Sequence, residues 1–194
     1  VGCFEMTGDG IAEVPDPSGL FLSRGAPVPG TCVTISLEGR RAMPVEVQAL
    51  VNTTSAPNPR RVTNGVDSSR VAMILAILER RAGVKVSDKD VYVSTVGGVR
   101  LIEPAADLAI AVAVASAMHD FAVPHEVAAV GELSLAGEIR PVTMAGQRSG
   151  EAKRLGYTTL VDADAVTLSP AINQIKALAA RAAGHAKLRD VPEF

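Results

Sequence analysis

Aromatic residues are scarce in this sequence: 194 residues include two Tyr, four Phe and no Trp. Proteins that hold single-stranded nucleic acid without sequence preference commonly stack its bases on aromatic side chains. The composition therefore argues against recognition of single strands by base stacking. Hydrophobic residues still make up 47% of the chain, so Val, Ala, Leu and Ile must build the core of one domain of ordinary size.

An excess of charge of one sign is also lacking, because 19 Lys and Arg oppose 21 Asp and Glu for a formal net charge of −2. No global basic field points to nucleic acid or to a membrane surface, so any nucleic-acid contact needs a local basic patch. The longest apolar run, 108–117, is about half of a membrane span. No signal peptide opens the chain. We expect a cytoplasmic protein with no membrane partner.

Residues that bind metals or nucleotides are few and badly spaced. Cys3 and Cys32 lie too far apart for a metal-ligand or redox pair, and we expect free thiols in a reducing compartment. No spacing typical of zinc ligands links the three histidines, which are His119, His125 and His185. The Gly97-Gly98 pair lacks the Gly-Lys-Ser/Thr that completes a phosphate-binding loop. The chain itself is therefore expected to bind no metal and no cofactor.

Strands are expected early in the chain, and helices alternate with strands later. Turn signals and apolar alternation predict strands over residues 4–6, 11–14, 31–37, 42–51, 90–96, 128–130 and 159–161, the first four in an antiparallel sheet. Helices are predicted from Asp67 or Ser68 to Gly83 and over 103–118, 144–155 and 171–183, with one helical turn at 19–24. This order favours a single α+β or mixed α/β domain over residues 1–194, with a loosely ordered tail from about residue 184.

Two segments, 96–108 and 131–142, resemble the proteolytic domain of the Lon protease family. In that family a Gly-Pro-Ser-Ala-Gly loop presents a nucleophilic Ser, and a segment that follows a Pro-Val/Ile pair supplies a Lys base. A buried Lys whose pKa is lowered can deprotonate such a Ser. Here the matched positions hold Ala105 and Gly146, so the resemblance implies a degenerate Lon-like fold of the ribosomal protein S5 domain 2 type without the catalytic dyad.

The remaining nucleophile and base candidates do not restore the pattern. Ser134, Ser149 and Lys153 are near in sequence, but their spacing matches nothing in the Lon motif. We therefore expect no enzymatic activity from this chain and assign it no catalytic residue. The alternative is a Lon-type serine peptidase with an unconventional nucleophile.

The whole chain resembles the Lon-like carboxy-terminal domain of the RadA (Sms) family of bacterial DNA repair proteins. The resemblance spans roughly residues 1–165 and rests on segments 1–6, 44–51, 58–61, 65–70, 78–83, 90–93, 103–109 and 131–132. It implies a fragment of a longer protein whose upstream part carries a zinc motif and a RecA-like ATPase. The longer protein would need ATP, Mg and Zn, act on branched DNA in recombination, assemble as a hexameric ring and work with a recombinase.

Four arginines are candidates for DNA contact. Arg60 and Arg61 lie in a predicted loop, and Arg70 and Arg81 are eleven residues apart, so they share one helix face. The guanidinium fork can engage two phosphate oxygens. The alternatives are solvated or ion-paired surface charges and contacts between subunits. The leading hypothesis is a scaffold for oligomerisation and DNA contact in a DNA-repair ATPase, and a pure protein-interaction module stays open.

Overall fold

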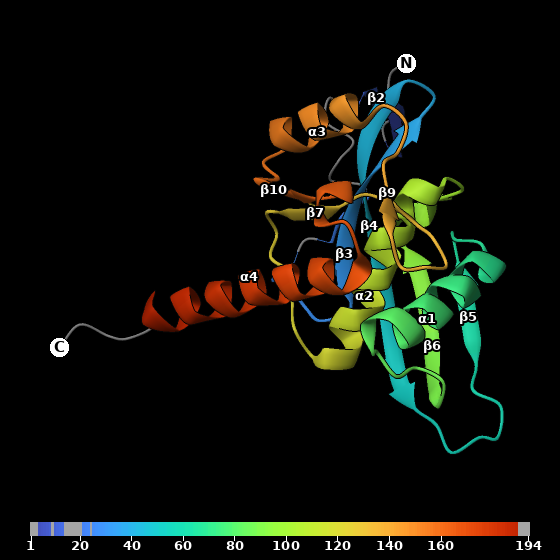
Figure 1. The fold of residues 1–194 in the computed structure, drawn as a ribbon. Coiled ribbons are helices and arrows are strands. Elements are labelled where there is room, and N and C mark those ends of the chain that lie inside the picture. The colour runs from blue at the N-terminus through green and yellow to red at the C-terminus, as the bar shows by residue number, and fades with distance from the viewer. Residues whose placement is uncertain (1–3, 9, 14–20, 24, 190–194) are drawn as a thin grey trace.

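The computed structural model describes residues 4–8, 10–13, 21–23 and 25–189 (Figure 1). Its centre is a six-stranded sheet in the order β10-β7-β3-β4-β6-β5. The strands are β3 (Thr31–Glu38), β4 (Arg41–Thr53), β5 (Arg61–Asn64), β6 (Lys89–Thr95), β7 (Val127–Ala129) and β10 (Thr159–Val161). Two small hairpins stand apart, formed by β1 (Phe4–Thr7) with β2 (Gly10–Glu13) and by β8 (Glu132–Leu133) with β9 (Ile139–Arg140).

The sheet is mixed. β4 pairs antiparallel with β3 and β6, whereas β5, β7 and β10 join their neighbours in parallel. The helices are α1 (Ser68–Ala82), α2 (Asp107–His119), α3 (Ala145–Arg154) and α4 (Leu168–Arg189), with a short 3-10 turn, η3 (Pro104–Ala106), before α2. The predicted mixed α/β architecture is confirmed.

The sheet has helices on both faces, but unequally. α2 packs on β3 and β4, and α1 and α4 pack on α2, so every residue from Asp107 to Ser116 is buried. This explains why α2 is apolar all round rather than on one face. α3 lies on the opposite face, where a smaller cluster around Ile35, Ala42 and Tyr157 covers only part of the sheet.

The ends of α1 follow from its sequence. Asp67 caps the helix by accepting the backbone N–H of Arg70 at 2.7 Å, and Gly83 ends it in the left-handed conformation that glycine tolerates best. Both ends agree with the prediction.

Several features differ from the sequence-based expectation. β1 and β2 form a sheet of their own and do not join β3 and β4 in one antiparallel sheet. Arg61, expected in a loop, begins the edge strand β5, and residues 132–140 form a hairpin for which no strand was predicted. α4 extends to Arg189, past its predicted end at residue 183, because most of the residues beyond that point are good helix formers such as Ala, Lys, Leu and Arg. Residues 19, 20 and 24 of the helical turn predicted at 19–24, together with Cys3 and residues 190–194, lie outside the described residues, and residues 21–23 are not helical.

Candidate functional site

The two segments that carry the Lon-like pattern meet at the start of α2. The carbonyl of Ala105 accepts the N–H of Gly131 at 2.9 Å, and the N–H of Leu108 donates to the carbonyl of Gly131 at 3.1 Å. Ala105 is 3% exposed and packs in the apolar cluster on the α3 side of the sheet. Position 105 therefore presents a buried methyl group and no nucleophile.

A buried ion pair lies beside this junction. Arg148, in α3 and 1% exposed, donates to both carboxylate oxygens of Glu103, at 2.8 and 2.5 Å. Its remaining N–H groups donate to the carbonyls of Ile35 at 2.6 Å and Thr143 at 3.0 Å. The guanidinium thus ties α3 to β3 and to the residue that precedes η3.

The Glu103 carboxylate is held in its ionised form. Oε1 also accepts the hydroxyl of Ser36 at 3.0 Å and the N–H of Leu37 at 2.9 Å. Burial works against ionisation, but the hydrogen bonds from Arg148 and Leu37 outweigh it and keep the pKa of Glu103 below its ordinary value.

A second ion pair fixes the first turn of α2. Arg70 in α1 donates Nε to Oδ1 of Asp107 at 2.7 Å and Nη2 to the other oxygen. The N–H of Leu133 also donates to Asp107, at 2.9 Å, and Glu132 lies 4.0 Å from the Arg70 guanidinium. Burial raises the pKa of Asp107 despite the bond from Arg70. Arg70 therefore joins α1, α2 and β8.

The structure places the other three candidate arginines in different surroundings. Arg61 donates its guanidinium to the carbonyls of Val86 at 2.8 Å and of Lys89 and Arg60. Arg81 donates Nε to the carbonyl of Leu135 at 3.2 Å and packs on the turn between β8 and β9. The shared face of Arg70 and Arg81 thus faces the β8–β9 hairpin, with a groove of about 430 Å³ between hairpin and helix.

Arg60 is the arginine most available to a ligand among these four. It is exposed, and its backbone N–H donates to Oδ1 of Asp90 at 2.6 Å while its carbonyl accepts the N–H of Val91 at 2.9 Å. Within the described residues its guanidinium makes no hydrogen bond or ion pair. The backbone is thus fixed at the edge of the sheet, and the side chain remains free to bind.

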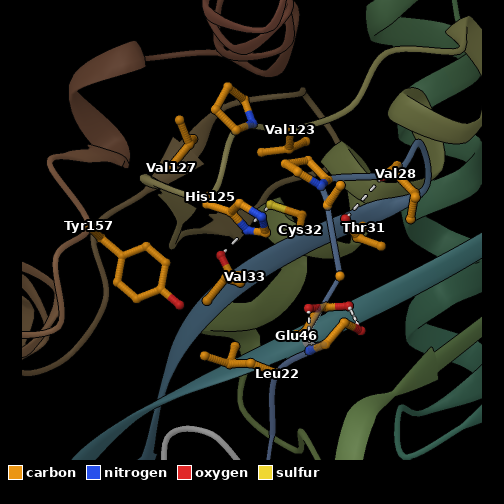
Figure 2. Close-up of a pocket in the computed structure, with 15 residues that line it drawn as sticks. Leu22, Val28, Thr31, Cys32, Val33, Glu46, Val123, His125, Val127 and Tyr157 are labelled. Carbon is orange, nitrogen blue, oxygen red and sulfur yellow. Dashed lines mark hydrogen bonds between the residues drawn. The ribbon is translucent and has the colours of Figure 1, made fainter. Parts of the chain in front are cut away.

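A pocket beside β3 and β4 surrounds the Cys32 thiol (Figure 2). Cys32 is 2% exposed, and burial together with the nearby Glu46 carboxylate raises the pKa of the thiol. The Glu46 oxygens accept the N–H and hydroxyl of Ser23 at 2.9 and 2.7 Å. A protonated, enclosed thiol is a poor nucleophile, so this pocket does not supply a catalytic cysteine.

Sequence reasoning missed both ion pairs. Asp107 gave a signal, since an acid at the start of an otherwise apolar buried helix needs a partner. Arg148 gave none, because it lies in a polar helix segment where arginine is ordinary.

Within the described residues, no group of three or more His, Cys, Asp or Glu could hold a metal ion. In the same part of the chain no helix has the length and hydrophobicity to span a membrane.

Comparison with known proteins gives two results. The family model described as ChlI, subunit ChlI of Mg-chelatase, matches residues 62–165. The chain is also similar to curated proteins named DNA repair protein RadA. The one from Mycolicibacterium smegmatis is 52% identical over 172 residues, covering 88% of this chain and 37% of the relative. Those from Pseudomonas aeruginosa and Escherichia coli are 46% and 44% identical over 158 residues, covering 81% of this chain and 35% and 34% of the relatives. The chain thus spans about a third of the length of these relatives.

Proposed function

Because this chain belongs to the family described as subunit ChlI of Mg-chelatase and is similar to DNA repair proteins named RadA, we propose that it is a DNA-contacting and ring-assembling scaffold. The scaffold is one domain of a longer DNA repair protein that acts on branched DNA in homologous recombination. Its fold is a degenerate Lon proteolytic domain. The similarity to the RadA proteins over 81–88% of the chain is the main support.

The non-catalytic role is supported by the residues at positions 105 and 146, which correspond in this proposal to the Ser and Lys of a Lon-type peptidase. Ala105 offers only a buried methyl group, and Gly146 has no side chain. Beside them, the Glu103–Arg148 ion pair is already hydrogen-bonded to the backbone of Ile35 and Leu37. These groups stabilise the junction of α3 with the sheet, and none is available as a nucleophile or a base.

DNA contact is assigned first to Arg60. Its guanidinium is exposed, and two hydrogen bonds already fix its backbone. Binding a phosphate should therefore cost little additional backbone entropy. Arg61 holds the edge strand β5 through its hydrogen bonds to the carbonyls of Val86 and Lys89. Arg70 connects α1 to α2, and Arg81 connects α1 to the β8–β9 hairpin. Contact by one arginine per subunit is weak, so a ring would gain affinity by presenting several copies at once.

The remaining requirements of the activity lie outside this chain. ATP, Mg and Zn are proposed to act in other domains of the longer protein, in keeping with the lack of a phosphate-binding loop here. The ring is proposed to be a homohexamer in the cytoplasm, with a recombinase as a further partner.

The experiment is fluorescence anisotropy of labelled duplex and branched DNA titrated with the 194-residue chain at several salt concentrations. Each phosphate contact contributes about −0.9 to the slope of log K against log salt on duplex DNA. Arg60→Ala should therefore flatten the slope by about one unit and weaken all sequences alike.

The matched control is Arg154→Ala, which removes an exposed arginine from the surface of α3. That variant should leave the salt slope unchanged. If Arg60→Ala and Arg154→Ala behave alike, the DNA path does not run over β5. If the chain binds no DNA at low salt while light scattering shows self-association, it is a protein-interaction module instead.

A further inference from the structure

Within the described residues, one half of the central sheet carries no helix on the face opposite α1 and α2, and this part is called the bare face. Alternate residues of a strand point to opposite faces. In β4 and β6 the odd-numbered residues Val47, Ala49, Val91 and Val93 are buried beneath the helices. The even-numbered residues of β4, β6 and β5 therefore point to the other face, where α3 packs mainly on β3 and β4. Figure 1 shows β5 at the outer edge of the sheet, beside β6.

Three rows of side chains cross this bare face. The central row is Leu50, Tyr92 and Val62, since both Leu50 and Val62 pair with Tyr92. Leu50 is 58% exposed and Val62 48% exposed, so the Tyr92 ring lies between two exposed apolar side chains. Two such residues in one register row, with an aromatic ring between them, make an apolar strip across three strands.

The flanking rows are polar. Gln48, Ser94 and Asn64 lie on one side of the strip. Gln48 already donates to Ser23 and Glu46, so the exposed Asn64 is the amide of this row that a ligand can reach. Asn52, Asp90 and Arg60 lie on the other. Arg60 is on the same face as Val62, two residues along the chain, which makes it a diagonal neighbour of Tyr92. Asp90 is the one acid in these rows, and one of its oxygens already accepts the Arg60 N–H.

From this arrangement we infer that the bare face binds single-stranded DNA, with one base stacked on Tyr92 between Leu50 and Val62. The inference rests on the proposed function and extends it from phosphate contact to base contact. Aromatic rings stack on any base, the exposed Asn64 amide can bond to a base edge, and the Arg60 cation beside the ring can hold the adjacent phosphate. A duplex keeps its bases paired and cannot reach the ring.

The placement of Tyr92 revises the conclusion drawn from composition. Scarcity of aromatics argues against an array of stacked bases, but one ring on a bare sheet face can stack one base. The second tyrosine, Tyr157, is 7% exposed on the α3 side of the sheet and is not available for stacking.

The test compares Tyr92→Leu, which keeps an apolar side chain, with Tyr92→Phe, which keeps the ring. Anisotropy is measured with labelled oligothymidine and with a duplex, in the 194-residue chain at one low salt concentration. Loss of one stacked base should weaken oligothymidine binding of Tyr92→Leu by about 5- to 150-fold. Tyr92→Phe should bind as wild type, and duplex binding should be the same for all three proteins.

A second readout uses the absence of tryptophan. In a Tyr157→Phe background Tyr92 is the sole tyrosine of the chain. Oligothymidine should then quench its fluorescence, and the duplex should not.

The outcomes separate this inference from the proposed function. If Tyr92→Leu binds oligothymidine as wild type while Arg60→Ala still flattens the salt slope on duplex DNA, stacking is wrong and the phosphate contact stands. If Tyr92→Leu loses self-association in light scattering with DNA binding unchanged, the face is a contact between copies of the chain. If wild type binds neither DNA, both proposals fail.

Discussion

Arg148 donates two hydrogen bonds to the carboxylate of Glu103, and the two residues lie 45 positions apart in the sequence. Apart from Ala152, Arg148 is the only residue of α3 that is buried. The attachment of this helix to the sheet therefore depends mainly on this ion pair, on the hydrogen bonds from Arg148 to Ile35 and from Gln147 to Arg40, and on Ala152, rather than on an apolar stripe.

Replacing Arg148 with Met should destabilise the fold by about 3–5 kcal/mol, because it leaves the Glu103 charge without its partner. The measurement is urea unfolding followed by circular dichroism. Arg154→Met, which breaks the exposed Arg154–Glu151 pair of the same helix, should cost no more than about 1 kcal/mol. Similar costs for the two variants would show that the Glu103–Arg148 pair does not hold α3.

Stability should fall in acid through Glu103. Its pKa is lower in the folded chain than the value of about 4.3 in the unfolded chain. The stability that ionised Glu103 contributes is therefore complete above the pKa of the unfolded state. It is lost as pH falls through the lower pKa of the folded state. Wild type should exceed Glu103→Gln in stability near pH 7, and the difference should shrink below about pH 4. A difference that stays constant down to pH 2 would contradict the ionised pair.

Restoring the two dyad side chains should not restore a peptidase. A Ser at position 105 would place its hydroxyl among apolar residues, since Ala105 packs with Ile35, Ala128 and Val130. A nucleophile must reach both its base and the substrate carbonyl. The Ala105→Ser/Gly146→Lys variant should leave casein intact and remain unlabelled by a fluorophosphonate. Clear cleavage would mean that only two side chains separate this domain from an active enzyme.

The hydroxyl of Ser116 serves two backbone groups at the end of α2. It accepts the N–H of Gly30 at 2.8 Å and donates to the carbonyl of Phe121, with no exposure to solvent. Ser116→Ala leaves both groups unpaired and should cost about 1–3 kcal/mol by urea unfolding. Ser87→Ala, at an exposed position, should change stability by less than about 0.5 kcal/mol. Equal effects would mean that another group replaces the hydroxyl.

Local signals predicted much of the fold. Asp67 and Gly83 mark the ends of α1 because capping depends on residues within one turn. β5 was missed because Arg61–Asn64 is short, shows no apolar alternation and pairs in parallel with a strand 25 residues later. Parallel pairing leaves no turn in the sequence to reveal it.

The candidate site was less predictable, because its geometry depends on contacts between distant segments. The spacing of Arg70 and Arg81 correctly predicted a shared face. It did not show that the β8–β9 hairpin lies against that face or that Asp107 binds Arg70. The row of Leu50, Tyr92 and Val62 appears only when the register of three strands is known.

The burial of α2 from Asp107 to Ser116 has a consequence for how the domain opens. Its first turn is bound to α1 and β8 through Asp107, and its last turn to the Gly30 segment through Ser116. Neither α1 nor β8 can separate from α2 without exposing part of this helix. The amide protons of its buried residues should therefore exchange with solvent only when the whole domain unfolds, whereas those of the exposed residues 180–184 in α4 should exchange through local opening.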